Sequence, residues 1–251
     1  MGQDIAVSVV IPAYNAAAYI GDAIQSVLNQ SENVEIIVVD DGSTDGTARE
    51  AARFGDAIHL VRFGRNQGIP DALNAGLEQA RGAIIGFLDA DDIWPPKRLH
   101  VGLELMSRGI APICWGRTQI LFIDRAGGGW STSPEWPPRH YPSLGAILFR
   151  KDVFARVGGF DPQLRHALDI DLLARIMEAG IPIHRHDDIA LHWRRHQNNI
   201  TNNVQLDRDY FLSALQLAMQ RRRATARRDS PNGAKDGVQS AAPLRSPRSD
   251  R

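Results

Sequence analysis

The sequence contains a single cysteine, Cys114, among its 251 residues. One cysteine excludes a disulfide bond within the chain and is typical of a reducing compartment. No apolar run approaches the roughly 18 residues that a membrane-spanning helix needs, and the N-terminus lacks the charged start and long apolar segment of a signal peptide. We therefore expect a cytoplasmic protein that does not span a membrane.

A glycine-rich phosphate-binding loop is also missing. Dinucleotide-binding folds carry G-x-G-x-x-G after the first strand, whereas here the first predicted strand is followed by Pro-Ala-Tyr-Asn-Ala-Ala at residues 12–17. A Walker loop is absent as well. A bound phosphate group must therefore be held in another way, and a divalent cation between carboxylates is the expected one.

The formal net charge is zero, but the two signs are distributed unevenly. Residues 221–251 hold nine Lys or Arg and three Asp, a net charge of +6, so the remainder carries −6. An acidic body disfavours nucleic acid as a partner. The basic tail lacks an apolar period, so we expect disorder there, and its cations suit peripheral contact with an anionic membrane face.

Strands and helices alternate in the first part of the chain. Apolar strands are predicted at about residues 5–11, 34–39, 58–62 and 83–88, with helices between them, which favours a parallel α/β sheet. Later elements follow a less regular order, and the Gly- and Pro-rich stretch at 125–138 is predicted to be a mobile loop without regular structure. Helices are expected at 97–108, 152–157, 169–179 and 207–219, and strands at 113–123, 145–150 and 184–193.

Carboxylates follow two of the predicted strands. Asp40 and Asp41 come after one strand, and Asp89, Asp91 and Asp92 come after another in the pattern D-x-D-D. A single Asp in such a place is commonly a turn former or helix cap. The carboxyl ends of parallel strands meet at one ligand-binding edge of the sheet, so five carboxylates there predict a site for a divalent cation and a diphosphate.

Four motifs in succession resemble those of the family 2 glycosyltransferases. They are VVIPAYN at 9–15, IIVVDDGSTD at 36–45, NQG at 66–68 and FLDADD at 87–92. The resemblance implies a single GT-A domain, Rossmann-like, with a mostly parallel sheet and helices on both faces. Residues 1–98 would then bind the nucleotide sugar, 99–220 would bind the acceptor, and 221–251 would form the tail.

The resemblance also implies roles for particular residues. Pro12 and Tyr14 would line the nucleoside pocket, and Asp41 with Asp40 would bind the base and ribose. Asp91 would contact Mn²⁺ or Mg²⁺ on the diphosphate, with Asp89 directed to the ribose or to the water shell of the metal. The remaining donor-site positions carried over from the motifs are Ala13, Asn66 and Ala90.

The catalytic base of the family lies in an acidic pair at the start of a later helix. The matching stretch here is Ala-Leu-Asp-Ile-Asp-Leu at 167–172, which places Asp169 at the base position. Leu168 replaces the usual glutamate, and Asp171 is a nearby rival for the role. An Asp at that point can also be a helix N-cap.

Two further segments carry candidates. WRRHQNNIT at 193–201 resembles a family segment that returns to the diphosphate or metal, which makes His196 a candidate metal ligand and Arg194 a candidate phosphate contact. Trp115, Trp130 and Trp136 are candidates for stacking on sugar rings, two of them in or beside the Gly- and Pro-rich loop, as part of an acceptor lid.

The function implied is metal-dependent, inverting transfer of a sugar from a nucleotide diphosphate sugar to a hydroxyl. We expect a UDP-sugar as the donor and a glycan or lipid-linked acceptor, in cell-surface polysaccharide synthesis. A nucleotidyltransferase and a non-catalytic nucleotide-sugar-binding relative are the alternatives.

Overall fold

The computed structural model describes residues 6–123, 128–164, 167–197 and 199. The predicted helix at 207–219 and the predicted basic tail with its membrane contact lie outside the described residues. Among the described residues, no helix combines the length and the apolar character needed to cross a bilayer.

Four parallel strands form the first half of the sheet. They are β1 (Val7–Ala13), β2 (Val34–Asp40), β3 (His59–Arg62) and β4 (Ile84–Phe87), in the spatial order β3-β2-β1-β4. The residues of β1 and β2 are buried almost throughout, as expected for strands covered on both faces. The predicted parallel α/β arrangement is confirmed.

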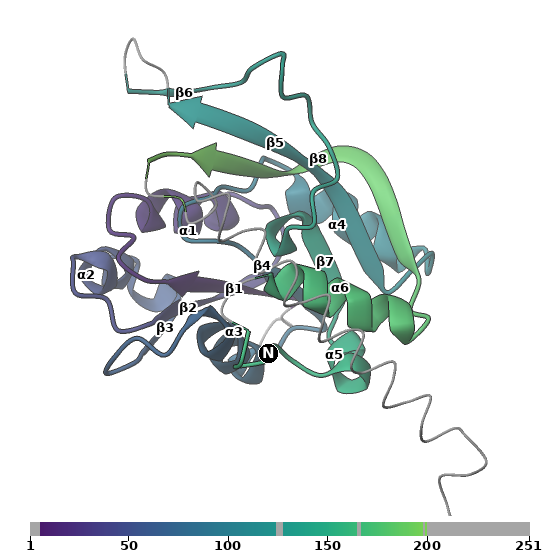
Figure 1. Ribbon diagram of the computed structural model, residues 1–251, viewed down its shortest axis with the longest axis horizontal. Coiled ribbons are helices and arrows are strands. Elements are labelled where there is room, and N and C mark those ends of the chain that lie inside the picture. The colour runs from purple at the N-terminus through teal and green to yellow at the C-terminus, as the bar shows by residue number, and fades with distance from the viewer. Residues whose placement is uncertain (1–5, 124–127, 165–166, 198, 200–251) are drawn as a thin grey trace, which may run out of the picture.

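Helices connect these strands and cover both faces. They are α1 (Ile20–Leu28), α2 (Thr47–Ala52) and α3 (Ile69–Gln79). Figure 1 shows α1 on one side of the parallel strands and α3 on the other. Gly76 lets α3 approach β1 closely, because a Cβ there would lie 2.2 Å from a methyl carbon of Val10.

The second half of the chain extends the same sheet. It contains α4 (Arg98–Ser107), β5 (Ile113–Ile123), β6 (Trp130–Ser131), β7 (Ile147–Arg150), α5 (Asp152–Val157), α6 (Leu168–Glu178) and β8 (Ile183–Arg195). Strand β7 joins β4 to β5 with antiparallel pairing on both sides, and β8 pairs with β5 in parallel. The eight strands therefore form one mixed sheet.

One expectation for the Gly- and Pro-rich stretch was wrong. It was predicted to lack regular structure, but Trp130 and Ser131 form β6, which pairs with Ile123 and Phe122 of β5. A two-residue strand at a sheet edge is formed by backbone pairing and needs no alternation of apolar and polar side chains. The composition of this stretch therefore gave no sign of the strand.

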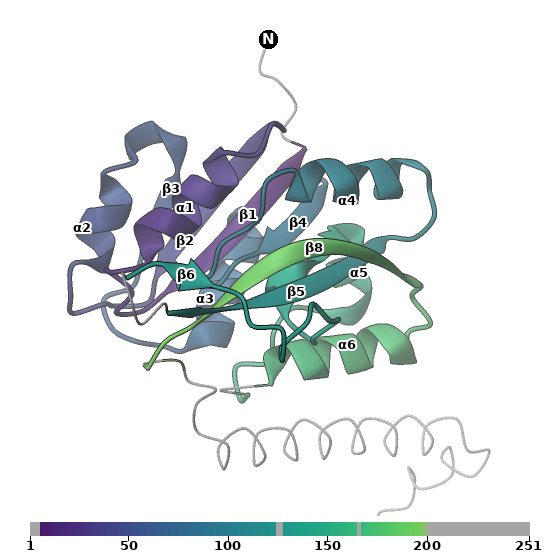
Figure 2. The same cartoon turned by 90° about the horizontal axis from the view of Figure 1, so that it is seen from above.

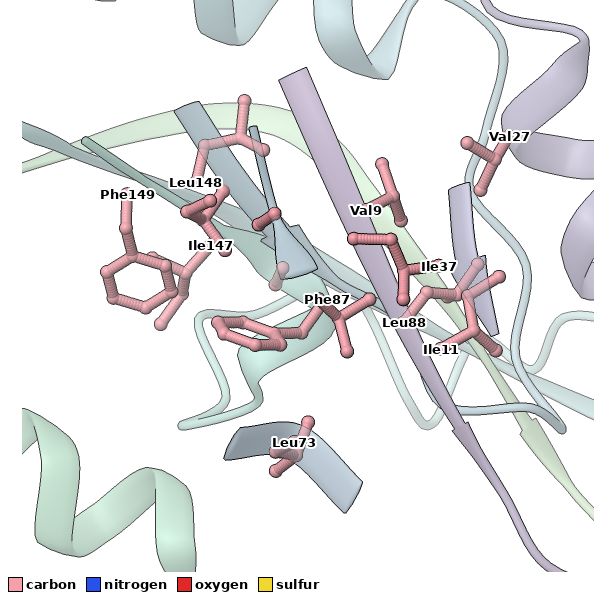
Figure 3. Packing of buried hydrophobic residues seen from close by; sticks show 14 of the residues in the cluster. Val9, Ile11, Val27, Ile37, Leu73, Phe87, Leu88, Ile147, Leu148 and Phe149 are labelled. Atoms are coloured by element: carbon pink, nitrogen blue, oxygen red, sulfur yellow. The ribbon is translucent and has the colours of Figure 1, made fainter. Parts of the chain in front are cut away.

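The apolar core fills the space between sheet and helices. Figure 3 shows side chains of β1, β2, β4 and β7, with Val9, Ile37, Phe87 and Phe149 among them, packed together and against helix residues such as Leu73. The rings of Phe87 and Phe149 meet edge to face with centroids 6.0 Å apart. This core holds the strand ends of both halves in fixed relative positions.

Strand β8 links the two halves at the site. Figure 2 shows it running beside β5 as a long pair that passes over the other strands. Within β8, His192 forms an antiparallel bridge with Ile93, just after the acidic motif. The residues after β8 are thereby brought next to the turn that follows β4.

Candidate functional site

The ends of β1, β2 and β4 place the predicted motifs at one edge of the sheet. The backbone N–H of Asp41 donates to Ala13 O at 2.8 Å, and that of Leu88 donates to Val10 O at 3.0 Å. The turns after these three strands are therefore neighbours. This is the sheet edge at which α/β proteins bind ligands.

Asp41 joins the turns after β2 and β3. It is 3% exposed, and its two carboxylate oxygens accept hydrogen bonds from the backbone N–H groups of Gln67 at 2.7 Å and Gly68 at 2.9 Å. Gly42 has φ +69°, and a Cβ there would lie 2.4 Å from the carbonyl carbon of Arg65. Only glycine allows the turn after β2 to approach the turn after β3 this closely. The two turns together form one wall of the site, and the exposed side chain of Asn66 belongs to this wall.

Asp40 is buried beneath this wall. It is 1% exposed, and its carboxylate accepts from the Ser43 N–H at 3.1 Å and lies 3.4 Å from Nε of Arg62. In this arrangement Asp40 stabilises the turn. Its predicted contact with a nucleotide stays a prediction.

The loop after β1 forms the adjoining wall. Pro12 is half-buried, Ala13 is buried and the Tyr14 side chain is 49% exposed. Asn15, with φ +50°, fixes the loop to its neighbour, because its N–H donates to Ser43 Oγ at 3.0 Å and its side-chain oxygen accepts from Thr44 N–H at 2.9 Å. Tyr14 thus presents an open ring beside the Asp41 turn.

The acidic motif forms a tight turn after β4. The N–H of Asp92 donates to Asp89 O at 3.0 Å, and the Asp92 carboxylate accepts from the Arg194 N–H at 2.9 Å. Asp92 is 2% exposed, and burial together with the charges of Asp91 and Asp89 raises its pKa well above the usual value. Ala90 is also buried, so Asp89 and Asp91 are the members of the motif that reach solvent.

Asp169 lies close enough to this turn to act on it electrostatically. Burial, followed by the charges of Asp91 and Asp169, raises the pKa of Asp89. Asp89 keeps an exposed surface, so the two neighbouring carboxylates are the main cause of its raised pKa. The predicted base therefore lies within electrostatic range of a predicted metal ligand, although the two are 80 residues apart in the sequence.

Asp169 and Asp171 have different surroundings. Asp169 is half-buried in the first turn of α6, and its carboxylate accepts from the N–H of Ile170 at 2.8 Å. Asp171 is 1% exposed, and its carboxylate pairs with Nε of Arg175 at 2.9 Å. Only Asp169 of the two is accessible to a substrate, while Leu168 is buried in the core.

Two residues that follow β8, His196 and Asn199, contact one oxygen of Asp91. Nε2 of His196 and Nδ2 of Asn199 both lie against Oδ2 of Asp91, at 3.1 and 3.3 Å. The ring of His196 stacks on Tyr19, with centroids 4.4 Å apart and an angle of 18°. Tyr19 and Asn199 were not among the predicted residues. Asn199 lies in the 193–201 segment that was singled out, but its contact with Asp91, like that of Tyr19 with His196, joins distant parts of the chain.

Arg194 is placed differently from its predicted role. It is 1% exposed, and its guanidinium donates to Asp91 O, to Asp22 Oδ2 at 2.7 Å and to Tyr19 O at 3.3 Å. All of its nitrogens therefore contact protein, which links α1 to the acidic turn. Direct contact with a phosphate stays a prediction.

The carboxylates at this turn fit a divalent cation whose remaining ligands come from the substrate. Burial and the two neighbouring carboxylates of Asp91 and Asp169 raise the pKa of Asp89, and a cation would relieve the repulsion among the three carboxylates. No three His, Cys, Asp or Glu side chains in the described part of the chain are grouped as a complete metal site. Mg²⁺ is commonly held by one or two carboxylates together with phosphate oxygens, and the pair Asp91 and Asp89 matches that number.

The three candidate tryptophans differ in burial and in their contacts. Trp115 is 6% exposed, and its Nε1 donates to Tyr141 O at 3.1 Å, so its predicted stacking on a sugar was wrong. A position in a central strand buries it. Trp130 is half-buried, with the Arg194 guanidinium 5.4 Å from its ring, and Trp136 is 41% exposed beside Phe122.

Similar proteins were found by sequence. A putative teichuronic acid biosynthesis glycosyltransferase of Bacillus subtilis is 44% identical over 104 residues, which cover 40% of this chain and 41% of that protein. A UDP-Glc:α-D-GlcNAc-diphosphoundecaprenol β-1,3-glucosyltransferase of Escherichia coli is 36% identical over 121 residues, 47% of this chain and 48% of that protein. The matched part thus spans less than half the length of either relative.

Solved structures of GT-A glycosyltransferases share the fold. A mannosyltransferase from Pyrobaculum calidifontis, in complex with GDP-Man and Mn²⁺, superposes with a TM-score of 0.67 at 20% identity. The superposition covers 85% of this chain and 64% of the other. The family model described as glycosyl transferase family 2 matches residues 8–170, which are more than half of the sequence. The chain therefore belongs to this family.

Proposed function

We propose that the chain transfers a sugar from a nucleotide diphosphate sugar to a hydroxyl group, with inversion at the anomeric carbon. The observation that carries the proposal is that Asp91 and Asp169 both act electrostatically on Asp89, which follows β4 at the carboxyl edge of the parallel strands. Such a transfer needs one carboxylate to accept a proton and a positive charge to stabilise the leaving diphosphate. The site offers residues for both tasks.

The nucleoside part of the donor is assigned to the wall formed by the first two turns. The Tyr14 ring and Asn66 are exposed there, and Asp41 is buried at the turn after β2. Pro12 and Ala13 would form the base of this wall. The E. coli relative is named for a UDP-sugar, which supports a UDP-sugar as donor.

Mn²⁺ or Mg²⁺ is the proposed cofactor, held by Asp91 and Asp89 with His196 as a further candidate. When bound, the cation would neutralise charge on the departing diphosphate. The P. calidifontis structure contains Mn²⁺ with its nucleotide sugar, which supports this assignment. Within the chain, Asp91 is the better-fixed ligand, because His196 and Asn199 hold one of its oxygens.

Asp169 is the proposed base. It would take the proton of the acceptor hydroxyl while the oxygen bonds to the anomeric carbon and the bond from that carbon to the diphosphate oxygen breaks. Attack opposite the leaving group inverts the configuration. The side chain suits this task because it is partly accessible and lies near the diphosphate end of the site.

The acceptor is proposed to be a glycan or a lipid-linked sugar. Trp130 lies beside Arg194 at the edge of the site, where its ring could contact a sugar. The E. coli relative is named for a diphosphoundecaprenol acceptor, which supports the lipid-linked class. A location at the cytoplasmic membrane face, with contact through residues 221–251, would suit such an acceptor and rests on the sequence alone.

Turnover of UDP-sugars by the wild type and by Asp169→Asn tests the proposal. We expect metal-dependent release of UDP from at least one UDP-sugar in the presence of acceptor, reduced by a factor of about 10² to 10⁴ in the variant. UDP binding should be the same in both proteins. Equal turnover in both would remove Asp169 from the mechanism, and absence of turnover with UDP binding intact would favour a non-catalytic relative.

A further inference from the structure

One oxygen of Asp91 receives two hydrogen bonds from the segment that follows β8. Oδ2 lies 3.1 Å from His196 Nε2 and 3.3 Å from Asn199 Nδ2. Within the described residues, Oδ1 has no hydrogen-bond partner. The Asp91 side chain is 31% exposed, so one oxygen is held by protein while the other remains available to a ligand.

Asn199 uses its whole amide group in this arrangement. Nδ2 donates to Asp91 Oδ2 and to Arg194 O, the latter at 3.1 Å, and Oδ1 accepts from the His196 N–H at 2.5 Å. The reversed amide would bring its oxygen against a carboxylate and a carbonyl. The three contacts therefore fix the amide orientation, and Asn199 is only 8% exposed.

The backbone from which Asn199 projects is anchored to α1. The buried Arg194 guanidinium pairs with Asp22 at 2.7 Å and lies 5.3 Å from the Tyr19 ring. The His196 ring stacks on the same tyrosine. Rotation of the Asp91 carboxylate would thus break its hydrogen bonds with His196 and Asn199, and the segment that carries these two residues is itself held against α1.

We propose that Asn199 is a positioning residue that turns Oδ1 of Asp91 toward the cleft and thereby prepares Asp91 to bind the divalent cation. It acts through Asp91 and does not itself touch the substrate. The inference rests on the proposed metal-dependent function. Groups that orient a metal ligand in this way typically affect metal affinity by about 10- to 100-fold.

The Asn199→Asp substitution separates this role from a purely structural one. Aspartate keeps an oxygen that can accept from the His196 N–H, so the turn can persist, but it loses the donor to Asp91 and adds a negative charge beside it. Gln197→Glu is the matched control, because it makes the same amide-to-carboxylate change at an exposed position two residues away. Asn199→Ala removes the donor without adding charge.

Calorimetric titration of Mn²⁺ into each protein with saturating UDP is the test. We expect Asn199→Ala to weaken Mn²⁺ binding by about 10-fold or more, and Gln197→Glu to stay within about 2-fold. In Asn199→Asp the lost donor weakens binding while the added carboxylate attracts the cation, so the loss there should be smaller. Binding of UDP without metal and the thermal unfolding midpoint should change little. Should Asn199→Asp fail to fold, Asn199→Ala is judged by the same criterion.

Two outcomes would overturn the inference in distinguishable ways. Mn²⁺ affinity in both Asn199 variants equal to that of the wild type would show that Asn199 does not prepare Asp91, while leaving the proposed function in place. No Mn²⁺ binding by folded wild type in the presence of UDP would remove the metal-dependent function as well.

Discussion

Asp169 and Asp171 lie two positions apart at the start of α6, and the structure gives them different tasks. Asp171 is buried against Arg175, whose Nη1 also donates to Val157 O at 2.6 Å. Asp171→Asn should therefore lower the free energy of unfolding by about 3 kcal/mol, because it leaves a guanidinium without its charge partner. Denaturant unfolding measures this loss.

The same variant is the counterpart of Asp169→Asn in turnover. Asp171→Asn should keep its kcat at a temperature where it is folded, whereas Asp169→Asn should lose it and keep its stability. A large fall in kcat for well-folded Asp171→Asn would contradict the assignment of the two residues.

The sequence could not separate these residues, because both fall in the first turn of a helix and either can cap it or face a cleft. Their difference comes from packing: α6 turns Asp171 toward Arg175 and the chain around Val157. The motif residues at the strand ends were predictable, since Asp41 and Asp89 follow apolar strands. The roles of Arg194, Tyr19 and Asn199 were not, because they arise from contacts across more than 100 residues of sequence.

At the scale of elements, Glu35 joins the amino-terminal ends of β1 and β2 to the turn before β4. Its carboxylate accepts from Ser8 Oγ at 2.6 Å and from the backbone N–H and Nε of Arg81 at 2.9 and 2.5 Å. Burial raises its pKa, but these hydrogen bonds and the Arg81 charge outweigh burial and hold the pKa below 4.5. Glu35→Gln should lower the free energy of unfolding by about 1–2 kcal/mol at neutral pH.

The stabilisation from Glu35 should depend on pH with a defined sign. Because the pKa is lower in the folded state than in the unfolded state, the contribution is present above pH 4.5 and is lost as the pH falls through the folded-state value. The difference in stability between wild type and Glu35→Gln should therefore shrink in acid. A difference that grows between pH 6 and about pH 3 would contradict the ion-pair account.

Helix α4 carries an unusual group into the core. Arg98 is 2% exposed, and its three guanidinium nitrogens have no hydrogen-bond partner among the described residues, although the Trp94 ring lies 5.3 Å away. Burial lowers the pKa of Arg98 to about 10. At neutral pH the buried charge is therefore retained at a cost in free energy.

Arg98→Met should leave stability unchanged or raise it by about 1–2 kcal/mol, because it replaces a poorly compensated charge with an apolar side chain of similar length. Leu99→Ala, at a fully buried neighbour, should instead lose about 2–5 kcal/mol. Denaturant unfolding of both variants makes the comparison. A loss in Arg98→Met as large as that in Leu99→Ala would mean that the guanidinium has stabilising partners.

The secondary elements themselves were largely predictable. The continuous apolar runs of β1, β2 and β4 indicated buried parallel strands, and the apolar face of α6 indicated its helix. The edge strand β6 was not predictable, since two residues carry no period. The pairing of β8 with β5 was also not predictable, because apolar periodicity identifies strands but not which strands become neighbours.

At the scale of the whole molecule, the two halves of the sheet meet where the site forms. The first half supplies the strand ends with Tyr14, Asp41 and Asp91, and the second half supplies Asp169 from α6 and the segment after β8. Neither half holds all the groups needed for the proposed transfer. The proposed transfer therefore requires a nucleotide diphosphate and a cation to bind together at this junction.

Thermal unfolding with UDP, GDP, dTDP and CDP, each with and without Mn²⁺, tests that dependence most directly. A ligand at 100 times its dissociation constant that binds only the folded state adds about 2.7 kcal/mol of stability. We expect UDP with Mn²⁺ to raise the unfolding midpoint, and expect that rise to disappear without metal and in Asp91→Asn. Folded protein whose midpoint is unchanged by every nucleotide, with and without Mn²⁺, would contradict the joint binding of nucleotide and cation at this junction.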